Sequence, residues 1–377
     1  MQNAPSPRRF AHIDAIRAVA VLLVMWTHYT ELLGRIAGSQ HWLDAIQRFF
    51  DFGRIGVVLF FCISGMLIPT SLRGAVPDGT RRFLIRRFFR LYPAFWLSLP
   101  LGYAVYWLLS GRHMPLSGLV ANATMIPTAF GFEPMMGHYW TLETELYFYV
   151  LTLLLFRARM LHSMRALCLT CAGLCVLFVA TSALKVFPTH TLSQYKGMLY
   201  HLAIMVWGAC FRQAYDYPEH LVTFGTRRIR VTSTYRRTTV ALALLLVVIA
   251  LLMAIVDWRH HDYAHVSTSF AYVLAIIAFV ALATVMKIRA RPLARLGEIS
   301  YSVYLLHGIP LHLTFWFCQH YPLSGGPLSA YVVAPALLTI PLSWVSYRLG
   351  EAPFVRLVHA WTSGSAAAVK QATEVAP

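Results

Sequence analysis

The sequence predicts an all-α integral membrane protein with about ten transmembrane helices and both termini in the cytoplasm. Three observations lead to this prediction: an apolar composition, ten apolar runs of spanning length, and cations concentrated in alternate connecting segments. Of the 377 residues, 58% are hydrophobic and only 12% are charged, whereas a soluble domain carries about 25% charged residues. Because so apolar a chain would expose too much hydrophobic surface to water, lipid is its expected solvent.

Apolar runs of spanning length recur along the chain, and a bilayer-crossing helix needs about 20 mostly apolar residues. The predicted spans are 14–34, 53–72, 92–111, 140–157, 165–187, 195–214, 238–257, 268–287, 301–319 and 328–349. If the N-terminus lies inside, most arginines and lysines fall in the cytoplasmic connections, as the positive-inside rule requires.

The domain organisation follows from the same pattern. Residues 1–362 form one transmembrane domain, and the Ala/Ser-rich segment 363–377 is expected to be a disordered cytoplasmic tail. The first apolar run contains Asp14 and Arg17 and lacks a small-residue cleavage pattern. We therefore expect it to remain in the mature protein.

The net charge of +17 favours an anionic partner. The cations lie between apolar runs rather than on one polar domain, so anionic lipid or a phosphorylated substrate is expected, and no nucleic acid. Six cysteines include a closely spaced group at 168–175, but no clustered histidine or further cysteine pair accompanies it. We predict small core residues there and no metal site.

Ionisable residues within the first predicted span are functional candidates, because charges are costly inside a bilayer. Asp14 and Arg17 are three residues apart and can pair on one helix face. Arg17 and His28 are eleven residues apart, close to three turns, which places them on nearly one face about 16 Å apart along the axis. The alternative is that Arg17 extends to the interface and His28 bonds a backbone carbonyl.

Two carboxylates open the span that follows Trp140. Glu143 and Glu145 are two residues apart and point to different faces of a helix. For Glu143 we favour a role at the helix dipole. Glu145 lies further along the helix and is expected to face a cavity.

A basic segment precedes the third span. Arg82, Arg86 and Arg90 recur every four residues and form one stripe on a helix, flanked by Arg87. Such a stripe suits lipid head groups or a polyphosphate. The alternative is plain positive-inside topology, which does not explain the interleaved aromatic residues.

Two further polar positions stand out near the C-terminus. Tyr304 and His307 are three residues apart within a span, and Glu351 precedes Pro353 at the end of the last span. Taken alone, each of these is better explained as an ordinary packed polar residue.

Six segments, in order along nearly the whole chain, resemble the motifs of the membrane-bound acyltransferase 3 family, which includes O-antigen and exopolysaccharide acetyltransferases. The matching positions are Asp14, Arg17 and His28; residues 60–68; Arg86, Arg87, Arg90 and Pro93; Trp140, Thr141, Leu142, Glu145, Phe148 and Tyr149; residues 296–307; and Glu351 with Pro353. The chain resembles the stand-alone type, without a C-terminal hydrolase-like domain.

The resemblance implies an O-acetyltransferase in the bacterial inner membrane that uses cytoplasmic acetyl-CoA as donor, without a metal. The acceptor would be a hydroxyl of lipopolysaccharide O-antigen or of an exopolysaccharide. His28 would act as general base and Glu145 would orient it. The expected substrate-binding residues are Asp14, Arg17, Arg86, Arg87, Arg90, Trp140, Tyr304 and His307.

Several alternatives stay open on the sequence alone. The acyl group could be another one, such as succinyl, and an acyl-histidine intermediate could form. A transporter or flippase without chemistry, or a lipid-binding scaffold, would also carry buried charges. Cys62 is not expected to carry the acyl group, since no neighbouring residue lowers the pKa of its thiol.

Overall fold

The computed structural model describes residues 11–184, 192–225, 230–321 and 323–362. The chain forms two compact units. The first unit combines Met1–Leu67 with Ser163–Ser300, and the second combines Ile68–His162 with Tyr301–Pro377. Each unit therefore contains segments that are far apart in the sequence.

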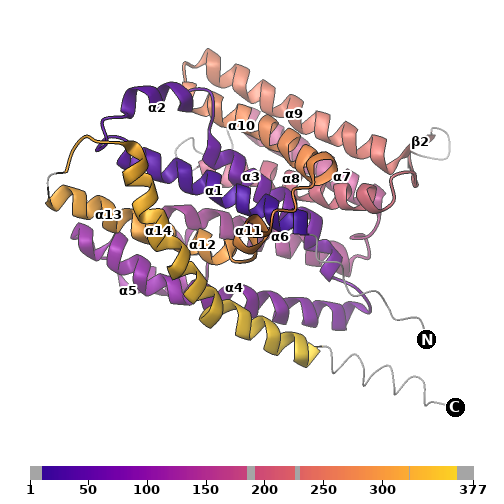
Figure 1. The fold of residues 1–377 in the computed structure, drawn as a ribbon. Coiled ribbons are helices and arrows are strands. Elements are labelled where there is room, and N and C mark those ends of the chain that lie inside the picture. The colour runs from indigo at the N-terminus through magenta and orange to yellow at the C-terminus, as the bar shows by residue number, and fades with distance from the viewer. Residues whose placement is uncertain (1–10, 185–191, 226–229, 322, 363–377) are drawn as a thin grey trace. The chain divides into compact units, whose positions relative to one another are not determined.

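The first unit is a bundle of long helices (Figure 1). Its helices are α1 (Ala11–Leu33), α2 (Gln40–Gln47), α3 (Phe52–Leu67), α7 (Met164–Ala183), α8 (Leu192–Asp216), α9 (Tyr235–Arg259), α10 (Tyr263–Val280), the π-helix η6 (Ala281–Met286) and α11 (Arg291–Glu298). Helix α1 packs against α3 and α11, α3 packs against α8 and α10, and α8 packs against α7 and α9.

Glycines allow two of these helix pairs to approach closely. A Cβ atom at Gly65 of α3 would collide with the carbonyl oxygen of Met205 in α8, and one at Gly297 of α11 would collide with the carbonyl oxygen of Asp14 in α1. Small residues at such contacts are a general device of helix packing in lipid, where close backbone approach replaces the hydrophobic effect. The contact at Gly297 also holds the backbone of α1 in place at Asp14, one turn before Arg17.

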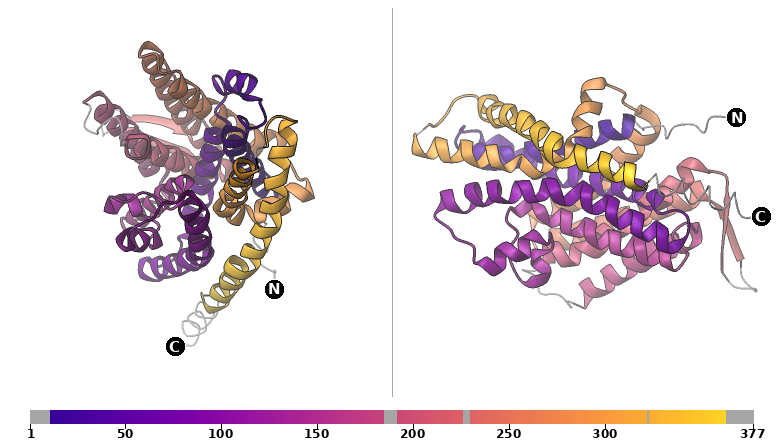
Figure 2. Two further views of the ribbon diagram at one scale, coloured as in Figure 1. Left: turned by 90° about the vertical axis from the view of Figure 1, so that its left-hand side faces the viewer. Right: turned by 90° about the horizontal axis from the view of Figure 1, so that it is seen from below.

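The second unit is built around the long helix α4 (Val76–Tyr106). The other elements are η1 (Pro69–Ser71), η2 (Leu108–Ser110), α5 (Leu116–Ala123), η3 (Pro127–Phe130), η4 (Gly137–Tyr139), α6 (Trp140–Arg157), α12 (Ser300–Leu306), α13 (Gly308–His320), α14 (Leu328–Ser346) and the π-helix η7 (Tyr347–Glu351), after which residues 352–362 continue as a helix. Helix α4 packs against α5, α6, α13 and η7, and α13 lies beside α14 (Figure 2).

One short hairpin of two strands accompanies the otherwise helical structure of the described residues. Strands β1 (Leu221–Gly225) and β2 (Arg230–Thr234) pair antiparallel, with Leu221 opposite Thr234 and Gly225 opposite Arg230. Both strands contain valine and threonine, whose branched side chains favour extended backbone. The sequence predicts only a connection between two spans at residues 221–234, so the hairpin was not predicted.

Each predicted span overlaps a helix among the residues that the structure describes. Six of the described helical segments are long and apolar enough to cross a bilayer, namely Ala11–Leu33, Phe52–Ser71, Met164–Ala183, Tyr235–Arg259, His265–Met286 and Leu328–Thr362. The protein is therefore a multi-pass membrane protein, consistent with the predicted helical class. The number of ten spans and the cytoplasmic position of both termini stay predictions.

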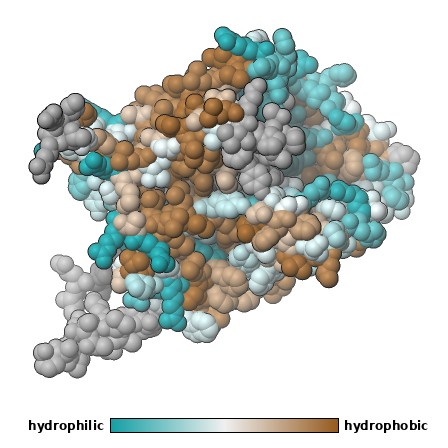
Figure 3. Space-filling view, turned by 180° about the vertical axis from the view of Figure 1, so that it is seen from behind, coloured by the Kyte–Doolittle hydropathy of each residue, from teal (hydrophilic) through white to brown (hydrophobic). Residues whose placement is uncertain are grey.

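The surface also fits a lipid environment. Hydrophobic residues cover much of the face drawn in Figure 3. Exposed apolar side chains are frequent on α9, where Val240, Leu244, Val248 and Leu252 recur every four residues and so form a stripe on one helix face. All six cysteines are free and buried. The predicted tail 363–377 lies outside the described residues.

Candidate functional site

Helix α4 carries the predicted arginine stripe on continuous helical backbone. It begins at Val76, with Pro77 and Asp78 in its first turn. Proline is tolerated there because the first backbone N–H groups have no partner within the helix, and an acidic side chain complements the helix dipole. Arg82, Arg86 and Arg90 then follow at intervals of one turn, as the sequence predicts.

Arg86, Arg87 and Arg90 meet in one pocket of about 160 Å³. The remaining lining residues come from η1, from α4 and from the helix after η7: Ser71, Phe83, Val355, Val358 and His359. The structure thus confirms that these three arginines lie together. Ser71 and His359 could not be predicted from the sequence, because no motif marks either position. The fold brings both of them to the arginines of α4.

Each arginine of this pocket is held differently. Arg86 donates from Nε and Nη2 to Thr362 Oγ1, at 2.8 and 2.6 Å. The guanidinium carbon of Arg87 lies 5.5 Å from the ring centre of Phe83 and 5.3 Å from that of Tyr149. Arg87 Nη2 also donates to Ser71 Oγ at 3.4 Å. Stacking of this kind orients a guanidinium while leaving its other N–H groups able to bind an anion.

Arg90 has carboxylate neighbours. Glu351 and Glu145 both act on it electrostatically. Glu351 is buried and also accepts a hydrogen bond from Ser302 Oγ at 3.4 Å. Both carboxylates attract the Arg90 guanidinium, which gives the Glu351–Pro353 motif a structural role beside the arginine stripe.

The two carboxylates of α6 differ in burial and in hydrogen-bond partners. Glu143 is only 5% exposed, and it accepts hydrogen bonds from Thr128 Oγ1 and from Tyr147 Oη, the latter at 2.7 Å. Glu145 is half-buried and accepts from Tyr149 Oη at 2.6 Å. Glu143 is thus the more buried of the two carboxylates, and Thr128 of η3 binds it. That Glu145 faces a cavity stays a prediction.

Tyr304 and His307 lie together in a buried polar cluster of the second unit. Tyr304 Oη donates to the carbonyl oxygen of His138 at 2.7 Å and lies 2.7 Å from Thr141 Oγ1. Nδ1 of His307 lies 2.8 Å from the carbonyl oxygen of Tyr304, and the rings of His138 and His307 are 4.5 Å apart. The expected proximity of Tyr304 and His307 is confirmed, and His138 is an additional member that sequence reasoning did not single out.

Trp140 begins α6 directly after His138 and Tyr139. Its side chain is half-buried. Its expected role in substrate binding stays a prediction.

The first unit holds the remaining predicted residues on α1. Arg17 Nη1 and Asp14 Oδ1 are 3.1 Å apart, which confirms the predicted ion pair. The His28 side chain is 38% exposed, and its Nδ1 lies 3.6 Å from Glu31 Oε2. Glu31 is thus a carboxylate beside the candidate base that the sequence analysis overlooked, although a spacing of three residues on a helix could have revealed it.

The predicted residues therefore gather in three places. Asp14, Arg17 and His28 follow α1 of the first unit. Within the second unit, Glu145 joins the three arginines, and Tyr304 and His307 form the cluster with His138. The expected pairing of His28 with Glu145 involves residues of different units and stays a prediction.

The described residues form a helical membrane protein in which three half-buried arginines line a pocket that could bind an anionic substrate. A family model described as an acyltransferase domain matches residues 10–348. The chain therefore belongs to the acyltransferase 3 family, as its motifs predict.

Among curated proteins the chain is similar to "Protein 2 in picA locus" of Rhizobium radiobacter, with 33% identity over 104 residues. The matched stretch is 27% of this chain and 47% of that protein, so the chain spans about half the length of this relative. No solved structure matches the chain.

Proposed function

We propose that the protein transfers an acyl group, acetyl in preference to larger groups such as succinyl, from cytoplasmic acyl-CoA to a hydroxyl of a cell-surface or exported glycan. The observation that carries this proposal is the pocket of Arg86, Arg87 and Arg90 in a chain of the acyltransferase 3 family. Coenzyme A carries several phosphate groups, and guanidinium groups bind phosphate through paired, charge-assisted hydrogen bonds.

The size of the pocket suits a phosphate rather than a whole nucleotide. Its volume of about 160 Å³ exceeds by several-fold the roughly 30 Å³ that one water molecule occupies in the liquid. The rest of the coenzyme would extend beyond it. Because Arg90 already has carboxylate neighbours, Arg86 and Arg87 are the cations that we expect to contact the donor.

Arg86 is the more informative of these two. It donates two hydrogen bonds of 2.8 and 2.6 Å to a neutral hydroxyl, Thr362 Oγ1, whereas Arg87 donates one longer bond of 3.4 Å to Ser71 Oγ. A phosphate can replace a neutral acceptor with a net gain, since hydrogen bonds between charged partners are roughly twice as strong. We therefore assign Arg86 the largest share of donor binding.

The chemical step requires a base for the acceptor hydroxyl. In our proposal His28 removes the hydroxyl proton while the oxygen attacks the thioester carbonyl. The carbon–sulfur bond breaks as the ester forms, and the proton returns from the imidazolium to the departing thiolate, giving free CoA. Glu31, 3.6 Å from His28, would stabilise the imidazolium, and Glu145 is the alternative carboxylate for this task.

The donor assignment can be tested by calorimetric titration of CoA into the purified protein. Arg86→Ala should weaken binding by about 10- to 100-fold, the effect of losing a charge-assisted hydrogen bond. Arg82→Ala is the matched control, because Arg82 lies on the same stripe but bonds the backbone carbonyl of Arg73 instead of lining the pocket. Equal CoA affinity for wild type and Arg86→Ala would remove the basis of the proposal.

A further inference from the structure

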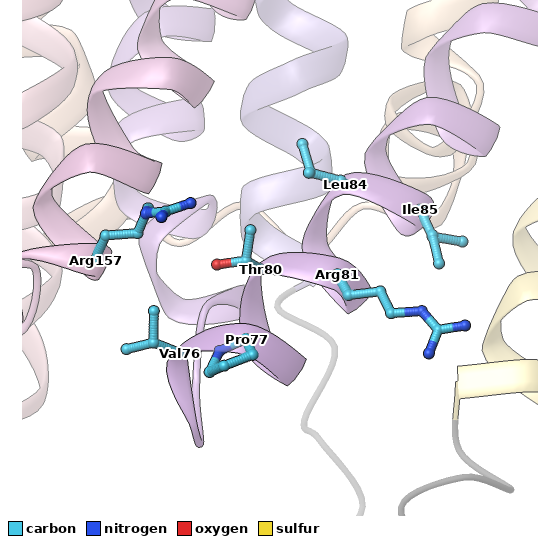
Figure 4. Close-up of a pocket in the computed structure, with 7 residues that line it drawn as sticks. All are labelled: Val76, Pro77, Thr80, Arg81, Leu84, Ile85 and Arg157. Atoms are coloured by element: carbon cyan, nitrogen blue, oxygen red, sulfur yellow. The ribbon is translucent and has the colours of Figure 1, made fainter.

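A second and larger pocket opens at the beginning of α4. It has a volume of about 460 Å³ and none of the arginines of the donor pocket lines it. Its lining residues, drawn in Figure 4, are Val76, Pro77, Thr80, Arg81, Leu84, Ile85 and Arg157. They come from the first turns of α4 and from the last residue of α6.

A glycine explains why these two helix ends lie together. Gly79 of α4 is buried, and a Cβ atom there would lie 2.7 Å from Cζ of Phe156 in α6. The missing side chain lets α4 pack directly on the Phe156 ring. Because Arg157 follows Phe156, this contact brings an α6 cation to the edge of a pocket whose other cation, Arg81, belongs to α4.

The chemistry of the pocket is amphiphilic. Arg81 and Arg157 are exposed, and neither forms a salt bridge with a residue that the structure describes. No carboxylate lines the pocket. The walls between the two cations are mostly apolar, and Leu84 is 50% exposed.

Thr80 adds a polar group between the apolar walls. Its Oγ1 is buried, and it has no hydrogen-bond partner among the described residues. In Figure 4 this hydroxyl points to the side on which Arg157 lies, whereas Arg81 extends from the opposite side of α4. Since Arg81 is exposed and has a long flexible stem, its guanidinium can turn toward a bound anion.

We propose that this pocket binds one anionic phospholipid. Its phosphate would lie between Arg81 and Arg157, and the first part of its acyl chains would cover Leu84 and Ile85. A soluble phosphate would satisfy the cations but leave these apolar side chains in water, so the lining favours an amphiphile.

A lipid bound in this pocket would also stabilise α4. Arg81 precedes Arg86 on α4 by little more than one helical turn. A lipid held between α4 and α6 would therefore fix the part of α4 that carries the arginine pocket. The inference does not depend on the proposed function, because lipid retention is measured without acyl-CoA or acceptor.

The test is native mass spectrometry of the purified protein after exposure to phosphatidylglycerol or phosphatidylcholine in detergent. Wild type should retain one phosphatidylglycerol in preference to phosphatidylcholine. The double variant Arg81→Gln, Arg157→Gln should lose about 30-fold in affinity, since each cation near a membrane surface contributes about fivefold to attraction for anionic lipid. Leu84→Trp should also reduce retention, because an indole at this exposed position would fill the pocket.

Arg165→Gln is the matched control, because Arg165 is an exposed arginine at the start of α7 and does not line the pocket. It should retain phosphatidylglycerol as wild type does. Unchanged retention in the double variant would overturn the proposal. Displacement of the lipid by an excess of CoA would also overturn it, since the pocket would then belong to the donor site.

Discussion

At the scale of single residues, the arginines of α4 show how similar side chains take different tasks. Arg90 lies beside Glu351 and Glu145, Arg87 stacks on Phe83 and Tyr149, and Arg86 bonds a neutral hydroxyl. The sequence predicts their common stripe, because helical spacing is regular. It cannot predict these partners, since each depends on which distant segment packs against α4.

The candidate base leads to the first kinetic prediction. His28→Ala should lower the rate of acyl transfer by at least 100-fold, the usual contribution of a general base. CoA affinity should remain unchanged, because His28 is not assigned to the donor pocket. The measurement is kcat for CoA release together with binding of CoA, and a fully active His28→Ala protein would contradict the proposed chemistry.

Glu31 and Glu145 are competing partners for that base. Glu31→Gln should reduce kcat if the carboxylate beside His28 stabilises its imidazolium, with an effect of up to about fivefold for the loss of one exposed ion pair. Glu145→Gln should instead change CoA affinity, since Glu145 acts on Arg90. A loss of kcat without any change of CoA affinity in Glu145→Gln would restore the pairing that the sequence suggests.

At the scale of elements, the close contact of α3 and α8 explains why the motif segment 60–68 contains a glycine. Gly65, in the motif segment 60–68, lies where a Cβ atom would collide with the Met205 backbone. Gly65→Ala should therefore destabilise the protein by about 1–3 kcal/mol, the usual cost of overpacking.

The control for this prediction is a glycine with open space around it. Gly173 of α7 has no atom within 4 Å of an added Cβ, and alanine is the better helix former. Gly173→Ala should leave thermal stability unchanged or slightly raised, measured by melting in detergent. Equal melting temperatures for Gly65→Ala and wild type would show that the α3–α8 contact can relax without cost.

The elements also show where sequence reasoning succeeds. Long apolar runs predict helices well, because a bilayer requires each backbone polar group to be bonded within its own segment. The hairpin of β1 and β2 was missed, since only five residues on each side form it. The break between α12 and α13 at His307 was missed for a related reason: Gly308 and Pro310 interrupt an apolar run that otherwise reads as one span.

Parts of the candidate site were beyond prediction for a physical reason. His138 and His359 join polar groups only because the fold of the second unit places them against residues far away in the sequence. Glu31, in contrast, was within reach, since it is three residues from His28 on the same helix. Side chains that meet on one helix can be predicted from their spacing in the sequence. Side chains that meet between helices can be identified only once the packing of the helices is known.

At the scale of the whole molecule, the topology can be tested by labelling single introduced cysteines from the outside of intact cells. The six native cysteines are all buried, which favours a low background. His113→Cys, in the connection after the third predicted span, should react with an impermeant reagent. Met160→Cys, in the connection after the fourth, should react only in opened cells, and the same result at both positions would refute the predicted orientation.

The central claim, acyl transfer from acyl-CoA to a glycan, is tested most directly with radiolabelled acetyl-CoA and purified protein in lipid vesicles. For wild type we predict label in the glycan fraction and stoichiometric release of CoA. His28→Ala should lose both. Arg86→Ala should need a higher concentration of acetyl-CoA to reach the same rate. Movement of a lipid-linked substrate across the vesicle membrane without CoA release would contradict the claim and favour a transporter.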